Sequence, residues 1–232
     1  NPDQDSVAYV ALHGIPHQMI DTVRDFFIPY STKRNERNRE MTQKLDLLIK
    51  PLGMSIDYEN DVLPLSKHAE GGSVTERHIL FALSKKITFG YGKGKGIADF
   101  LKKDLLISLN PRVEKFLLDK SNEYYEYDLL GALKSDLVSK IYINATLECP
   151  PVKEIICLSR KIGAISAYAY LGDVTDSVTG DKKSRKFEDD YLELLFDVIR
   201  DLGFNAVTYM PSRNSMEQLE RVRAMCEKYG FL

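Results

Sequence analysis

Cysteine is scarce in this 232-residue chain, and Cys149, Cys157 and Cys226 are widely spaced with no CxxC pair. An odd number of separated thiols indicates neither a disulfide framework nor a zinc ribbon, so we expect reduced, buried thiols. Long apolar runs are missing too, which argues against a membrane-spanning helix. No basic segment followed by an apolar stretch is visible at the start, so we expect no signal peptide, a cytoplasmic protein and no membrane partner.

A strong charge of one sign is also lacking. The chain has 32 Lys and Arg residues against 34 Asp and Glu residues, a net charge of −2. No long-range field therefore indicates nucleic acid or an anionic membrane as a partner. The chain is 44% hydrophobic, which is enough to bury a core in one or two domains.

The stretch 71–86, GGSVTERHILFALSKK, predicts the start of a helix. Ser73 or Thr75 can cap it, and apolar residues then recur at helical spacing. Arg77 and His78 would lie in the first turn, where free backbone N–H groups and the helix dipole favour an anion. They are therefore candidate phosphate-binding residues. The alternative is a capped surface helix whose Arg77 and His78 face water.

Three stretches of small, apolar or aromatic residues predict strands, at 7–15, 164–171 and 204–210. His13 lies near the end of the first, and Asp173 directly follows the second. Functional sites in α/β sheets gather at the C-terminal ends of strands, so both residues are candidate metal or substrate ligands. The alternatives are a His hydrogen-bonded at a strand end and an Asp in an Asx turn.

A helix is predicted at 32–52, and its first half, KRNERNRE, is rich in arginine. Arg34 and Arg37 are three residues apart, on one side of such a helix, so both could reach a phosphate. The alternative is a solvated charged face, which is the usual meaning of such a run.

The middle of the chain, 87–143, has helical patterns and no sustained strand alternation. We therefore expect a helical insertion at 87–143 in an α/β frame made by 1–86 and 144–232. The alternating glycines of 89–96 do not match the GxxxxGK[ST] phosphate loop and predict a flexible connector. The polar stretch 177–186 predicts a mobile loop.

The order of several segments resembles the PHP family, the polymerase and histidinol phosphatase group of metal-dependent phosphoesterases. ALHGI at 11–15 is similar to a family strand in which a metal-binding His precedes a Gly. TERHILFAL at 75–83 is similar to the family's R-P-H-I-A-x-A-L segment. Further similarity lies in the Arg-rich helix and extended piece at 33–62, in the helix–strand unit at 148–174 and in the late helix at 204–232.

The resemblance implies a distorted (β/α)7-type barrel of parallel strands with the helical segment inserted into it. The barrel would be incomplete, since the family's opening H-x-H and closing D-x-H strands are not present in this chain. The His of the family's A-H-P segment is also replaced, with Tyr170 or a neighbour in its place.

The resemblance also implies hydrolysis of a phosphate ester by metal-activated water. The substrate would be a phosphorylated small molecule or a nucleotide. The ions would be divalent Zn, Mn or Fe, and the resemblance makes His13 a metal ligand. The residue patterns described above add Asp173 as a candidate ligand and Arg37, Arg77 and His78 as candidate phosphate contacts. The alternative is a degenerate PHP-like domain that binds a phosphorylated ligand or a protein partner without catalysis.

Overall fold

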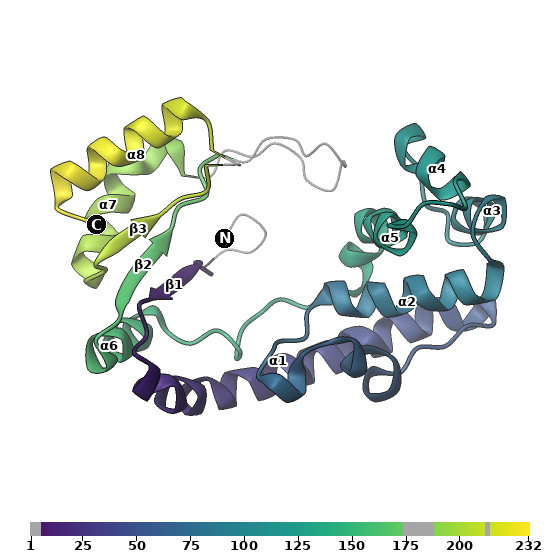
Figure 1. Ribbon diagram of the computed structural model, residues 1–232, viewed down its shortest axis with the longest axis horizontal. Coiled ribbons are helices and arrows are strands. Elements are labelled where there is room, and N and C mark those ends of the chain that lie inside the picture. The colour runs from purple at the N-terminus through teal and green to yellow at the C-terminus, as the bar shows by residue number, and fades with distance from the viewer. Residues whose placement is uncertain (1–5, 174–187, 212–213) are drawn as a thin grey trace. The chain divides into compact units, whose positions relative to one another are not determined.

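The computed structural model describes most of the chain (Figure 1). The described residues are 6–173, 188–211 and 214–232. The loop predicted at 177–186 lies outside them.

The chain separates into two compact units. The first, here called the sheet unit, comprises Asn1–Tyr30 and Thr146–Leu232. The second, here called the helical unit, is Ser31–Ala145. Residues 31–86 therefore group with the helical middle of the chain and not with the sheet.

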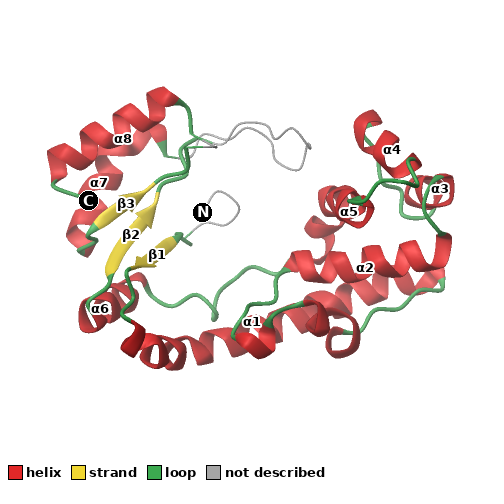
Figure 2. Ribbon diagram, in the orientation of Figure 1, coloured by secondary structure: helices red, strands yellow, loops and turns green. Residues whose placement is uncertain are grey.

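The sheet unit is built on three short strands, β1 (Val10–His13), β2 (Ile165–Ala169) and β3 (Ala206–Thr208), in the order β1-β2-β3. The central and last strands are parallel, whereas β1 runs antiparallel to β2 and pairs His13 with Ile165. Figure 2 shows the arrow of β1 pointing against the other two. All three predicted strands thus belong to one sheet.

The predicted (β/α)7-type barrel is wrong, because the sheet formed by the described residues is open and one of its three strands is antiparallel. A parallel neighbour requires a crossover that returns the chain to the same end of the sheet. After β1 the chain instead continues into α1 (Ile20–Ile49) and the helical unit before it reaches β2. The apolar pattern at 7–15 indicates a strand but carries no information about its direction.

Three helices of the sheet unit, α6 (Val152–Ile162), α7 (Leu192–Leu202) and α8 (Met216–Tyr229), supply apolar side chains that pack against β2 and β3. Helical spacing places one face of each helix inward. The fully buried members of this core are large: Tyr170, Phe196, Ile199 and Val222 are at most 1% exposed.

Helix α1 is longer than the sequence predicts, since it begins at Ile20 and not at Thr32. It continues through Pro29, which removes one backbone donor without ending the helix. The helix carries many charged residues, and no helix in the described part of the chain is both long and apolar enough to cross a bilayer.

The helical unit contains α2 (Glu76–Tyr91), α3 (Lys95–Lys103), α4 (Pro111–Leu118) and α5 (Tyr125–Ile141). The prediction that 87–143 is mainly helical is confirmed. Local signals explain the boundaries: the Asn110 side chain accepts the N–H of Arg112, and Pro111 takes the first position of α4. The apolar faces of these helices and of the second half of α1 form one core.

Tyr125 ties three of these helices together from the centre of this core. Its side chain is fully buried, and its hydroxyl donates to the Leu117 carbonyl at 2.8 Å, at the end of α4. The same hydroxyl accepts the N–H of Gly94 at 2.9 Å, at the start of α3. One phenol oxygen thus satisfies two backbone groups that water does not reach.

We expect Tyr125→Phe to lower the free energy of unfolding, because the Gly94 N–H and the Leu117 carbonyl would lose their partner. A buried group left unpaired costs about 1–3 kcal/mol. Urea unfolding measures the loss, and Tyr127→Phe is the matched control because Tyr127 is 63% exposed. Equal stability of the two variants would contradict the bridging role of Tyr125.

Candidate functional site

The two predicted metal ligands lie at opposite ends of the sheet. His13 is exposed at the end of β1, opposite Ile165, the first residue of β2. Asp173 follows the other end of β2, beyond Ala169. From Ile165 to Ala169 alone the strand extends about 13 Å, at a rise of roughly 3.3 Å per residue. A metal ion holds its ligands at roughly 2.0–2.6 Å, so His13 and Asp173 do not share one ion in this arrangement.

The backbone around Asp173 meets two other carboxylates. One oxygen of Glu188, Oε2, accepts the N–H groups of Leu171 and Gly172, each at 2.8 Å. Asp189 Oδ2 accepts the N–H of Asp173 at 3.0 Å. Three successive backbone donors at the end of β2 thus bind the side chains of two successive acidic residues.

Side chains from β2, its continuation and α8 complete this polar cluster. Tyr168 donates its hydroxyl to Glu188, and Tyr170 donates its hydroxyl to Asp189. Gln218 Nε2 donates to Asp189 Oδ2 at 2.7 Å, and Arg221 Nη2 lies 3.0 Å from Asp189 Oδ1. The sequence patterns did not predict this cluster. The sequence does show two tyrosines at alternate positions, Tyr168 and Tyr170, and an adjacent acidic pair at 188–189. No local pattern indicates that these residues contact one another, because about 20 residues separate them.

The pKa values of Glu188 and Asp189 are shifted in opposite directions. Burial raises the pKa of Glu188, although the bonds from Tyr168 and from the backbone N–H groups act in the other direction. Burial also acts to raise the pKa of Asp189, but the bonds from Tyr170 and Gln218 hold that pKa below its ordinary value. Asp189 is therefore an ionised acceptor for several donors at neutral pH.

The expected Zn, Mn or Fe ion has no matching site in the described part of the chain. Within residues 6–173, 188–211 and 214–232, no group of three His, Cys, Asp or Glu side chains is placed to hold a metal. The carboxylates clustered at the end of β2, those of Asp173, Glu188 and Asp189, already accept protein donors. These residues do not fit the metal that the family resemblance implies.

The predicted phosphate residues Arg77 and His78 lie in the first turn of α2, as the sequence indicates. His78 is half-buried, and its Nδ1 accepts the N–H of Thr75, the capping residue, at 3.1 Å. The neutral ring then carries its proton on Nε2. Arg77 is exposed, and it has no ion-pair or hydrogen-bond partner among the residues that the structure describes.

The two arginines that the sequence pairs on α1 have different partners. Arg34 Nη1 donates to the Ser73 hydroxyl at 3.0 Å, on the segment that leads into α2. Arg37 donates to the Ile143 carbonyl at 2.8 Å, and its guanidinium lies 5.5 Å from the centre of the Tyr142 ring. Arg34, and not Arg37, thus contacts the approach to the predicted phosphate residues.

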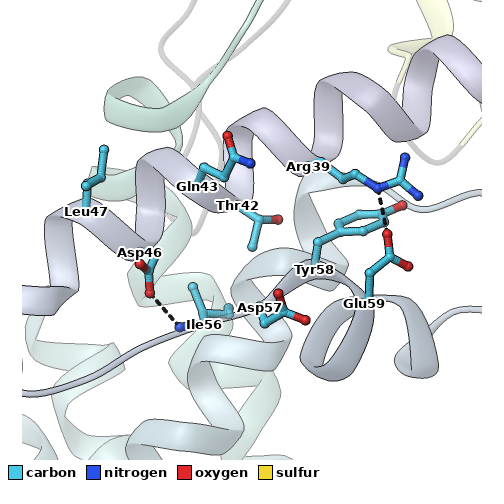
Figure 3. A pocket seen from close by; sticks show the side chains of 9 residues that line it. All are labelled: Arg39, Thr42, Gln43, Asp46, Leu47, Ile56, Asp57, Tyr58 and Glu59. Atoms are coloured by element: carbon cyan, nitrogen blue, oxygen red, sulfur yellow. Dashed lines mark hydrogen bonds and ion pairs between the residues drawn. The ribbon is translucent and has the colours of Figure 1, made fainter.

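A cavity of about 380 Å³ lies between α1 and the segment Ile56–Glu59 (Figure 3). Its one cation, Arg39, is paired with Glu59 at 2.6 Å and covers the Tyr58 ring at 4.9 Å. Asp46, on the other side of the cavity, accepts the N–H of Ile56. Because Asp46, Asp57 and Glu59 all line this cavity, its charge opposes a phosphate.

No protein-family model matches the chain, and a search of curated proteins found no match. Among solved structures, a protein of Bifidobacterium adolescentis, provisionally described as a metal-dependent phosphoesterase, is 18% identical. The match covers 87% of this chain with a TM-score of 0.47, and the chain spans about half, 52%, of that protein's length.

Asp189→Asn is expected to lower the free energy of unfolding at pH 7 by about 1.5–3 kcal/mol, the range for a hydrogen bond to a charged group. Because the pKa of Asp189 is lowered in the folded state, its contribution is present above the ordinary Asp pKa and is lost as pH falls through the folded value. The difference between wild type and variant should therefore shrink below about pH 4.

Urea unfolding at several pH values measures this difference. Asp201→Asn is the control, since the Asp201 side chain is 76% exposed. A stability difference for Asp189→Asn that stays constant from pH 7 to the lowest pH at which the protein is folded would contradict the role of the charge.

Proposed function

We propose that this protein is a phosphoesterase of the metal-dependent kind, and that the start of α2 binds the phosphate of its substrate. Several segments resemble the PHP family and follow one another in the family's order, which supports the reaction class. The observation that carries the phosphate site is Arg77, an exposed cation with no partner in the described part of the chain, beside a His78 ring fixed by the N–H of Thr75.

The start of α2 offers three kinds of donor to a phosphate. The N–H of His78 is bound by Thr75, so the backbone donors of this first turn are the N–H groups of Glu76 and Arg77, and the helix dipole favours an anion there. The guanidinium of Arg77 can bind two phosphate oxygens at once. The Nε2 proton of His78 is a third donor, because Nδ1 is engaged by Thr75. These groups bind and orient a phosphate.

Arg34 belongs beside this site. Its bond to Ser73 places a second guanidinium at the segment that precedes α2. In this proposal Arg34 adds positive charge near the entering phosphate, in the place that the sequence assigned to Arg37. The substrate class remains a phosphorylated small molecule or a nucleotide.

We expect Arg77→Ala to reduce kcat/KM for a phosphate ester about tenfold to a hundredfold. A charge-assisted hydrogen bond contributes roughly 1.5–3 kcal/mol, and each 1.4 kcal/mol is about a factor of ten. Arg77→Lys should recover only part, because an ammonium lacks the planar fork. Hydrolysis of p-nitrophenyl phosphate and of bis(p-nitrophenyl) phosphate, assayed with Mn²⁺, Zn²⁺ and Fe²⁺ and with a chelator, provides the measurement.

Lys85→Ala is the matched control, since Lys85 is an exposed cation on the same helix and its loss changes the net charge equally. If Arg77→Ala and Lys85→Ala behave alike, the start of α2 is only a capped helix. If phosphate binds but neither ester is hydrolysed with any of the three metals, the protein binds a phosphorylated ligand without catalysis.

We also propose that His13 contributes one metal ligand, from its exposed position at the end of β1 and its match to the family's His. It belongs to no group of three metal-ligating side chains among the described residues, so the test concerns His13 alone. His13→Ala should lower the metal content of the purified protein without lowering its thermal stability. His17→Ala is the control, an exposed His four residues further on. Equal metal content of the wild type and both variants, measured by elemental analysis, would remove His13 from the site.

A further inference from the structure

The end of β2 concentrates hydrogen-bond donors that all point at two carboxylates. The donors are three backbone N–H groups, of Leu171, Gly172 and Asp173, and the side chains of Tyr168, Tyr170, Gln218 and Arg221. We call this group of donors the β2 cradle. Successive N–H groups of this kind form an anion-binding concavity, and the addition of a guanidinium suits an oxyanion with several oxygens.

We propose that the β2 cradle is a second phosphate-binding site, and that the carboxylates of Glu188 and Asp189 occupy it when no ligand is bound. In this arrangement the two side chains stand in for the oxygens of a phosphate group. The contact is autoinhibitory, because a phosphate monoester or inorganic phosphate must displace the carboxylates to enter.

Polar side chains of other elements lie unusually close to the backbone of the cradle at Gly172. Gly172 has a φ of 67°, in the left-handed region that glycine adopts without strain. A Cβ added there would lie 2.7 Å from Gln218 Nε2, 3.0 Å from Asn214 Nδ2 and 3.0 Å from the Tyr170 hydroxyl. The missing side chain of Gly172 therefore lets three polar groups of other elements come close to the loop.

The position in the sheet is also that of a ligand site. The cradle follows β2 where β2 and β3 run parallel, and ligands of open α/β sheets bind at the carboxyl ends of parallel strands (Figure 1). Solvent reaches one side of the cradle, since the Arg221 side chain is 44% exposed while that of Asp189 is 10% exposed. A phosphate can therefore approach Arg221 first and compete for Asp189's donors.

The cradle is made of residues of the sheet unit, whereas Arg77 belongs to the helical unit. The test is made in an Arg77→Ala background, which removes the main cation of the other site. A result that excludes phosphate binding at the cradle is then distinguishable from one that excludes the proposed phosphoesterase function.

The experiment is a calorimetric titration with inorganic phosphate at fixed pH and ionic strength. Glu188→Gln with Asp189→Asn replaces both carboxylates by neutral amides of the same shape, which compete less well for charged and polar donors. We expect this double variant to bind phosphate at least tenfold more tightly than its Arg77→Ala parent. Adding Arg221→Ala should abolish the gain.

Asp201→Asn with Glu227→Gln is the matched control, since it changes net charge equally at two exposed positions of the sheet unit. An equal gain in this control, or no gain in the cradle variant, would overturn the proposal. A gain that survives Arg221→Ala would overturn it as well.

A second measurement decides the matter if the double variant does not fold. In the Arg77→Ala protein with Glu188 and Asp189 intact, rising phosphate should shift the amide NMR signals of Leu171 and Gly172 toward a saturating value. Chloride at equal ionic strength should leave them unchanged. Amide signals that respond alike to phosphate and to chloride would show that the carboxylates hold the cradle permanently.

Discussion

The antiparallel pairing of β1 with β2 determines what the sheet unit can do. It places the end of β1 beside the start of β2, so that His13 and Asp173 lie at opposite ends of the sheet. Among the three strands of the described residues, β2 and β3 alone bring their C-terminal ends to one edge. The polar cluster of this unit lies at the end of β2, and His13 lies at the opposite end of the sheet.

At that edge the backbone N–H groups that follow β2 need acceptors, because an unpaired buried donor is costly. Glu188 and Asp189 supply them, and the tyrosines, Gln218 and Arg221 satisfy the remaining oxygens. Glu188 is 4% exposed, so it is a buried acid retained by hydrogen bonds from several elements. The same bonds that make this cluster stable leave its carboxylates unsuited to a metal ion.

The sequence predicted much of the local structure and little of the long-range arrangement. Helix α4 (Pro111–Leu118) lies in the stretch 87–143 that was predicted to be helical, and Asn110 and Pro111 are its local start signal. The three strands were predicted from apolar patterns, but a pattern does not specify strand direction, so the parallel barrel was wrong. Arg77 and His78 were placed correctly in the first turn of α2 by local rules, whereas the partners of Glu188 lie too far away in sequence to be inferred.

The two phosphate sites that we propose, the start of α2 and the β2 cradle, offer the same kinds of donor but differ in whether protein groups already occupy them. Arg77 has no counter-ion among the described residues, so a phosphate arriving there displaces only water. In the cradle a phosphate must displace carboxylates of the same chain, whose attachment gives them a high effective concentration. A dianionic phosphate with several acceptor oxygens competes for these donors better than a monoanion of one or two oxygens, because charge-assisted bonds strengthen with the charge of the acceptor. In this proposal, occupancy by Glu188 and Asp189 makes the cradle selective for multiply charged oxyanions, whereas the proposed site at α2 has no such competitor.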